Sequence, residues 1–86
     1  MNINDLIAIV KKKIKEEIVI EEIDIEDKSF LHKNHPGHQK GKFHLKLTIY
    51  SNELSKLNRV NSNKKIYKIL DEEMKEYIHS LQILIS

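Results

Sequence analysis

The fold is decided by FHLKLTIY, residues 43–50, which is the clearest strand in the sequence. Apolar and polar residues alternate along it, as expected where one face of a strand is buried and the other is open. The apolar positions are Phe43, Leu45, Leu47 and Ile49. A sheet built around this strand therefore forms the centre of the domain.

Upstream of this strand, the sequence predicts a helix followed by a second strand. A four-residue apolar repeat indicates an amphipathic helix over about residues 5–17, with Asn4 as its N-cap. The apolar period then changes to two between Val19 and Ile25, which is typical of a strand. We expect that strand to pair with residues 43–50 in the antiparallel direction.

Downstream, the sequence predicts two helices and a last strand. Residues 51–57 form a short helix or helical turn, and a longer helix follows an N-cap at Asn61 or Ser62. Alternation returns after Ile78, so the last strand begins at His79. Two intervening helices give a crossover long enough for parallel pairing. The expected fold is α+β in the order α-β-β-α-α-β, with a three-stranded mixed sheet backed on one side by helices.

Length and composition restrict the class of protein. An 86-residue chain with 40% hydrophobic residues has room for a single small domain, residues 1–86. It has no cysteine, so soft-metal chemistry must use imidazole or sulfur from a partner. The longest apolar run, residues 6–10, is too short to cross a bilayer, and the N-terminus lacks a signal-peptide pattern. We therefore expect a cytoplasmic protein without a membrane segment.

Four of the five histidines lie between residues 27 and 50. Residues 28–41 have no apolar periodicity, which predicts a long loop that contains His32, His35 and His38. Together with His79, these imidazoles would offer metal ligands if the fold brings them near one another. The competing interpretation is that the loop histidines are solvated and that His79 is a core residue bonded to a backbone carbonyl. His44, opposite the apolar face of its strand, is structural or simply exposed.

A series of short motifs resembles the BolA family. The motifs are Asp27-x-Ser29-x-x-His32-x-x-His35-Pro36-Gly37, then His44 with Tyr50-Ser51 closing a strand, then Ile66-Tyr67 in a helix, then Ile78-His79-Ser80-Leu81. Each motif alone is unspecific, but their order and spacing together are specific. The resemblance covers about residues 3–86.

This resemblance implies a fold similar to the type II KH module and a non-enzymatic, cytoplasmic adaptor that pairs with a monothiol glutaredoxin. It further implies an iron-sulfur cluster shared with a glutaredoxin cysteine and glutathione, and not tightly bound by the isolated chain. The ligands implied on this chain are His79 and one loop histidine. His32 stands at the family position, His35 is the near alternative, and His38 is a third candidate.

The alternative is a DNA-binding transcriptional regulator of the same fold, acting in stress response or morphology. Residues 28–68 carry a net charge of +9 although the whole chain carries +2, and the candidate contacts are Arg59, Lys64, Lys65 and Lys68. However, no glycine follows Gly41, so the G-x-x-G clamp of KH modules is missing. The family's usual R-H-R motif also reads Ser62-Asn63-Lys64. We expect any DNA binding to be weak and strongly salt-dependent.

The sequence predicts no catalytic residue and no organic cofactor. No nucleophile stands beside a base in a recognisable arrangement, and no glycine-rich phosphate loop is present. A hydrolytic zinc site built from the three loop histidines is the remaining enzymatic alternative, but no positioned acidic base accompanies it. Whether the free chain is a monomer or a homodimer stays open at this point.

Overall fold

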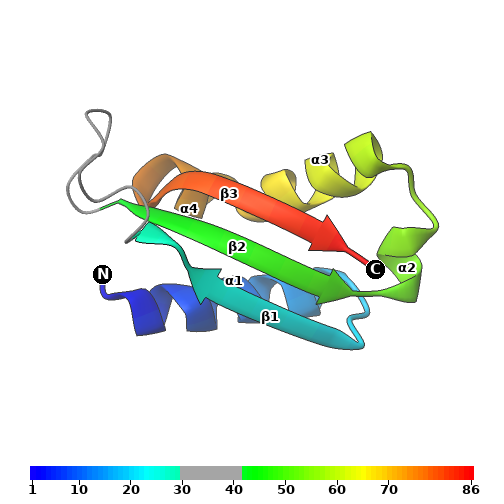
Figure 1. Cartoon of the computed structure of the whole chain (residues 1–86), viewed down its shortest axis with the longest axis horizontal. Helices are drawn as coiled ribbons and strands as arrows, with labels where there is room; N and C mark the ends of the chain where they lie inside the picture. Colours follow the sequence, from blue (N-terminus) through cyan, green and yellow to red (C-terminus); the bar gives the residue numbers. More distant parts are fainter. Residues whose placement is uncertain (30–41) are drawn as a thin grey trace.

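A computed structural model describes residues 1–29 and 42–86 of the chain. Its elements are α1 (Ile3–Glu17), β1 (Glu22–Asp27), β2 (Phe43–Tyr50), α2 (Asn52–Ser55), α3 (Arg59–Ile69), α4 (Asp71–Glu76) and β3 (Ile78–Ile85). Figure 1 shows the strands side by side with α1, α3 and α4 behind them. In the part of the chain that is described, no helix has the length and apolar character needed to cross a bilayer.

The strands form a mixed sheet with β2 at its centre. β1 and β2 are antiparallel, with Glu22 opposite Tyr50 and Asp27 opposite Leu45. β2 and β3 are parallel, and their register ends with Ile49 opposite Ile85. The predicted antiparallel pair, the parallel crossover and the α+β class are all confirmed.

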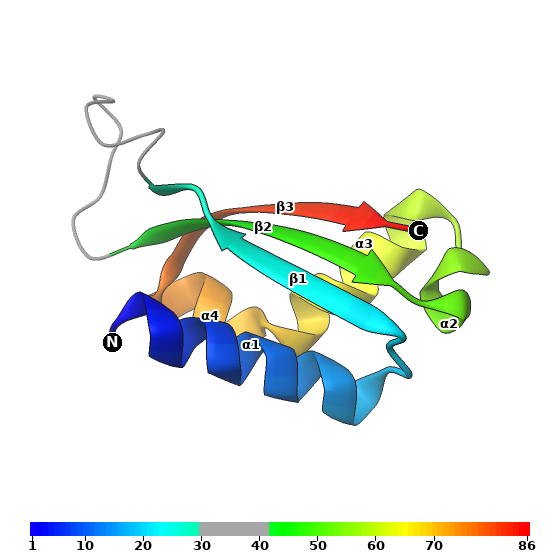
Figure 2. The same ribbon diagram turned by 60° about the horizontal axis from the view of Figure 1, so that its bottom comes forward.

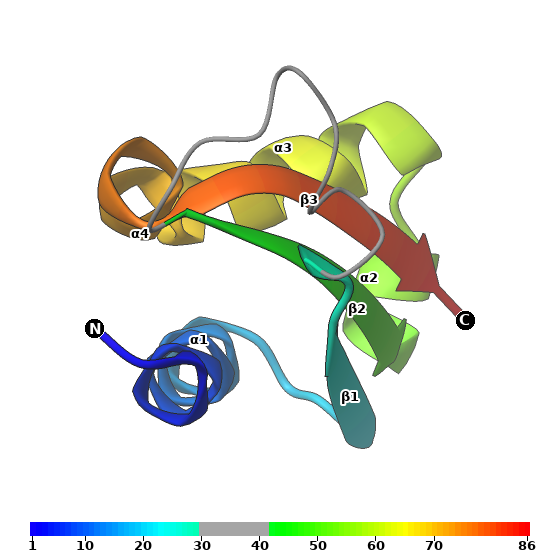
Figure 3. The same ribbon diagram turned by 60° about the vertical axis from the view of Figure 1, so that its left-hand side comes forward.

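Figure 2 shows that helices cover one face of the sheet and that no helix or strand of residues 1–29 and 42–86 covers the other, which we call the open face. Figure 3, viewed along the sheet, shows α1 beside β1 and β2, and α3 and α4 on the side of β3. The fully buried residues include the predicted repeat of α1 and the inward face of β2: Leu6, Val10, Ile14, Leu45, Leu47 and Ile49. The periodicities of four and two in the sequence therefore correspond to the two layers of one core.

Two predictions at the N-terminal end were wrong. The cap of α1 is Asn2, whose side chain accepts a hydrogen bond from the Asp5 N–H at 2.8 Å, so the helix begins before Asn4. Val19 is 71% exposed and precedes β1, because Ile18 fills the core position instead. The Val19 carbonyl instead accepts a hydrogen bond from the Ser51 hydroxyl at 2.8 Å, which ties this turn to the start of α2.

The predicted long helix also differs in detail. Asn58 caps α3 by accepting from the Asn61 N–H at 2.8 Å, so neither Asn61 nor Ser62 is the cap. Ser62 lies inside the helix, where its hydroxyl donates to the Arg59 carbonyl. The helix ends at Ile69 and is followed by its C-cap Leu70, whose ψ of 18° lies outside the helical range, so that α4 starts at the next residue.

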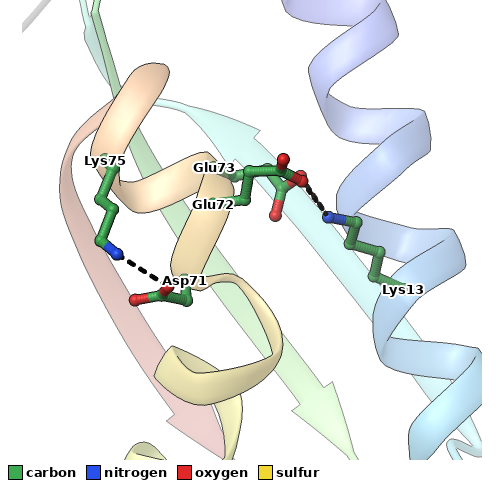
Figure 4. Close-up of polar contacts among 5 residues, drawn as sticks. All are labelled: Lys13, Asp71, Glu72, Glu73 and Lys75. Carbon is green, nitrogen blue, oxygen red and sulfur yellow. Dashed lines mark hydrogen bonds and ion pairs between the residues drawn. The ribbon is translucent and has the colours of Figure 1, made fainter.

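An ion pair connects the first and last helices, as Figure 4 shows. The Lys13 ammonium lies 2.5 Å from the Glu73 carboxylate and 3.3 Å from that of Glu72. The Glu73 side chain is only 5% exposed, whereas that of Lys13 is 33% exposed. The hydrogen bond to Glu73 raises the pKa of Lys13 above its ordinary value of 10.5, although partial burial opposes the shift. Lys13 therefore neutralises a carboxylate that is almost enclosed.

Candidate functional site

The last strand is irregular at His79. Phe43 pairs with Ile78 and His44 with Ser80, so the register shifts and His79 has no direct partner on β2. Ile78 is 1% exposed and Leu81 packs against the core, so two consecutive residues, His79 and Ser80, lie exposed between two inward-facing ones. A β-bulge produces this pattern and redirects a side chain. The His79 imidazole is thereby directed to solvent instead of toward the helices.

The irregularity brings His79 beside His44 on the open face of the sheet. The centroids of the two rings are 4.9 Å apart and their planes are inclined by 54°. The Nδ1 atom of His44 also lies 2.6 Å from the Ser80 hydroxyl. His44 is 5% exposed, so the alternative that it is simply exposed was wrong. It contacts both residues of the bulge and holds the exposed imidazole of His79 in place.

The motif Asp27-x-Ser29 fixes the chain at this same end of the sheet. The Asp27 carboxylate accepts a hydrogen bond from the Ser29 N–H at 2.9 Å, and the Ser29 hydroxyl accepts one from the His44 N–H at 3.0 Å. The Lys28 N–H donates to the His44 carbonyl at 2.7 Å. The entry to residues 30–41 is therefore bonded to the residue whose ring contacts His79.

The three loop candidates, His32, His35 and His38, lie outside the described residues. Within residues 1–29 and 42–86, no three histidine, cysteine, aspartate or glutamate side chains come together as a metal site. A metal at His79 would therefore need ligands beyond the described part of this chain. The contacts that His44 and Ser80 make at the bulge were not predicted from the sequence. The bulge could have been recognised in the sequence from the three-residue spacing between Ile78 and Leu81, because the rest of that strand alternates.

Replacing Ser29 by alanine is expected to lower the free energy of unfolding by about 1 kcal/mol, because the His44 N–H loses its acceptor in a partly buried position. Urea denaturation would measure the change. Ser55→Ala is the matched control, since that hydroxyl donates to the carbonyl of Asn52 at an exposed position of α2. Equal stability changes in the two variants would show that the bond from the His44 N–H to Ser29 adds nothing particular to the stability of this end of the sheet.

The predicted nucleic-acid contacts are gathered on α3, which contains four cations and no acidic residue: Arg59, Lys64, Lys65 and Lys68. Lys65 and Lys68 line a hollow of about 570 Å³ with Lys13, Glu16 and Glu17 of α1. Arg59 lies at a different hollow, beside the end of β3. Three of the four cations are therefore divided between two hollows, and the hollow that contains Lys65 and Lys68 also includes carboxylates.

Comparison with known proteins agrees with this arrangement. A family model described as BolA-like protein matches residues 14–86. The chain belongs to the BolA family. Over 75 residues this BolA-family chain is 31% identical to the DNA-binding transcriptional regulator BolA of Haemophilus influenzae, and the match covers 87% of this chain and 70% of that protein.

Solved structures confirm the fold of the BolA-family chain. The BolA domain of SufE1 from Arabidopsis thaliana superposes with a TM-score of 0.78 at 26% identity, covering all of this chain and 93% of that one. BolA1 from the same plant gives a TM-score of 0.76 at 26% identity, covering 91% and 86%. Membership of the BolA family thus accounts for the order of the elements. The chain has two candidate surfaces: the open face, where His79 contacts His44, and the helix α3, which Figure 2 shows on the other side of the sheet.

Proposed function

We propose that this chain is a non-enzymatic, cytoplasmic adaptor that pairs with a monothiol glutaredoxin and co-ligates a shared iron-sulfur cluster, in cluster trafficking or in iron or redox sensing. The observation that carries the proposal is the position of His79. Its exposed imidazole stands at a bulge, against His44, at the end of the sheet where Ser29 leads into the histidine-rich segment. His79 and one of His32, His35 or His38 would be the ligands from this chain.

The donor set fits a shared cluster. Iron-sulfur clusters are usually held by thiolates, and this chain has none, so the partner and glutathione must supply the sulfur ligands. Neutral imidazole in place of thiolate leaves less negative charge on a cluster and raises its potential. A ligating histidine is normally oriented by a second residue, and the ring of His44 is placed to do this for His79. Such a site suits transfer or sensing of a cluster.

The test is anaerobic reconstitution of the chain with a monothiol glutaredoxin, glutathione, iron and sulfide. Visible absorption and circular dichroism should reveal a mixed complex whose spectrum differs from that of glutaredoxin alone. The proposal fails if the spectrum of the mixture equals that of glutaredoxin treated in the same way and no complex of the two proteins is isolated.

DNA binding is the second candidate function, favoured by the four cations of α3 and by the name of the Haemophilus influenzae relative. If Lys64 and Lys65 contact phosphates, their joint replacement by alanine should reduce the slope of log affinity against log salt by about 1.8, because each phosphate contact contributes about 0.9. Fluorescence anisotropy with duplex DNA over a salt series measures this slope. Lys75→Ala is the matched control, as that lysine is exposed on α4 and paired with Asp71.

A slope that changes no more in the α3 variant than in Lys75→Ala would exclude α3 as the DNA-binding surface. His79→Ala also distinguishes the two candidate functions, because it removes the proposed cluster ligand and leaves α3 unchanged. The exposed side chain of His79 contacts the ring of His44, whereas Figure 2 shows α3 on the face of the sheet that the helices cover. We expect His79→Ala to leave the DNA affinity unchanged.

A further inference from the structure

The two edges of the sheet differ in charge. β1 has the sequence EIDIED, and its acidic residues are Glu22, Asp24, Glu26 and Asp27. β3 has the sequence IHSLQILI and contains no lysine, arginine, aspartate or glutamate. Charges along an edge strand discourage a further strand from pairing with it. β1 has this protection and β3 lacks it.

The hydrogen bonds of Ser86 show which backbone groups of β3 point outward. Its N–H donates to the Ile49 carbonyl at 2.9 Å, and its carbonyl accepts from the Ser51 N–H at 3.1 Å. The backbone N–H and C=O groups of Ser86 therefore point toward β2. Because successive residues of a strand direct these groups to opposite edges, those of Leu81, Ile83 and Ile85 face away from β2. The backbone groups that could pair with a further strand at this edge therefore belong to these three residues.

Only part of that edge is covered. The Leu81 carbonyl accepts a hydrogen bond from the Tyr67 hydroxyl of α3 at 3.0 Å. In the part of the chain that the structure describes, no residue bonds to the outward N–H and C=O groups of Ile83 and Ile85. One outward carbonyl of β3, that of Leu81, is thus bonded to α3, whereas the outward groups of Ile83 and Ile85 have no such bond among the described residues.

A hollow of about 500 Å³ lies next to Ile83 and Ile85, between β3 and the start of α3. Its apolar lining includes Leu57 and Leu84, both partly exposed, and its one cationic residue is Arg59. Figure 1 shows the end of β3 beside α2 and α3. A free strand edge next to an apolar hollow is the arrangement used by proteins that bind an extended peptide as an added strand.

We propose that this edge binds an extended segment of a partner protein, in which apolar side chains alternate with polar ones and an acidic side chain faces Arg59. The charge at the hollow favours this occupant, because its one charged lining residue, Arg59, is complementary to an acidic side chain. A second copy of the chain, paired through the same edge, has no acidic residue on its β3 strand to place against Arg59. Single-stranded nucleic acid has no backbone N–H and C=O groups with which to extend the sheet at Ile83 and Ile85.

This surface is independent of the proposed cluster site. His79 and Ile85 lie at opposite ends of β3, about 20 Å apart at roughly 3.3 Å per residue. Binding of a peptide at Ile83 and Ile85 leaves the open face at His79 accessible. A result at one site therefore does not decide the result at the other.

The test uses the full chain labelled with ¹⁵N and a blocked eight-residue peptide in which glutamate and threonine alternate with valine and isoleucine. We expect the amide signals of Ile83 and Ile85 to shift, and their hydrogen exchange to slow about tenfold or more when the peptide is saturating, because each N–H gains a carbonyl acceptor. Intermolecular nuclear Overhauser effects between the peptide and β3 would establish that the peptide pairs as a strand.

Three variants make the test specific. Leu84→Asp places a negative charge in the hollow and should weaken binding about tenfold, because it repels the glutamate side chains. Val19→Asp makes the same kind of change at an exposed residue outside the hollow and should leave binding unchanged. Arg59→Gln should weaken binding of the glutamate peptide but should not change binding of a peptide that carries glutamine in place of glutamate.

Several results would overturn the proposal. One is the absence of shifts at millimolar peptide, and another is shifts spread over the lysines of α3 without slower exchange at Ile83 and Ile85. Equal binding by a peptide with lysine in place of glutamate would remove the charge argument. Sedimentation that shows a dimer in which β3 is the interface would assign the edge to a second copy, and protection of these amides by oligothymidylate but not by the peptide would assign it to nucleic acid.

Discussion

Substitution of His79 by alanine is expected to abolish the spectrum of the mixed complex with a monothiol glutaredoxin. His79 is the one exposed histidine among the described residues, and under the proposed function an alanine would leave the cluster without that ligand. The neighbouring serine cannot compensate, because a neutral hydroxyl is a poor ligand for iron in a sulfur-rich cluster. The result should be near-complete loss of the absorption and dichroism features that differ from those of glutaredoxin alone.

Two variants make this result interpretable. Gln82→Ala changes an exposed residue on the same strand and should leave the spectrum intact. His44→Asn removes the ring that packs on His79 but keeps a polar group near Ser80, so we expect the mixed complex to form with lower yield. A mixed complex with an unchanged spectrum in His79→Ala would show that His79 is not a ligand. Equal loss in Gln82→Ala would show that the strand itself is damaged.

Replacement of Lys13 by methionine is expected to lower the free energy of unfolding by about 2 kcal/mol. The substitution leaves the almost enclosed Glu73 carboxylate without its cation, and breaking a buried pair in this way typically costs about 3–5 kcal/mol. The expected value is smaller because the Lys13 side chain is one-third exposed and water screens part of the interaction. Urea denaturation at neutral pH measures the difference.

The double variant Lys13→Met with Glu73→Leu should recover most of the loss, since an apolar pair needs no neutralisation. Lys75→Met is the matched control: its pair with Asp71 joins two largely exposed side chains on one helix, and its loss should cost about 0.5 kcal/mol or less. If Lys13→Met costs no more than Lys75→Met, the pair between α1 and α4 adds nothing particular to stability.

The alkaline pH dependence of stability tests the same contact. The hydrogen bond to Glu73 raises the pKa of Lys13 in the folded chain above its unfolded value of 10.5. The contribution of the protonated Lys13 to the free energy of unfolding is therefore fully present below pH 10.5. It is lost as the pH rises through the pKa of Lys13 in the folded chain. The stability difference between the natural chain and Lys13→Met should stay constant from pH 7 to 10 and decrease above that range. A constant difference up to pH 12 would contradict this assignment.

The main features of the fold could be predicted from the sequence because they depend on burial, which sets the apolar period. β2 was predicted with its observed bounds, and the mixed sheet followed from the length of the crossover. Helix starts were not predictable in the same way, because several asparagines compete as caps. Asn2 and Asn58 cap α1 and α3, although Asn4 and Asn61 lie within three residues of them.

The candidate site was only partly predictable for a different reason. His79 could be selected from its motif, but its contact with His44 depends on the register of two parallel strands that are distant in sequence. A one-residue shift in that register reverses which face a side chain occupies. The roles of Ser29 and Asp27 also required the structure, since each acts through a backbone N–H that sequence patterns do not show.

The acidic residues of β1 limit how large an assembly of this chain can become. Growth into a filament requires two adhesive edges on each subunit, so that every addition exposes a new site for the next. Here one edge carries four carboxylates, and a second copy of the chain that joins through its own β3 leaves only two such acidic edges exposed. Self-association through β3 therefore stops at two chains, so the uncharged edge strand does not direct the protein toward fibrillar aggregation.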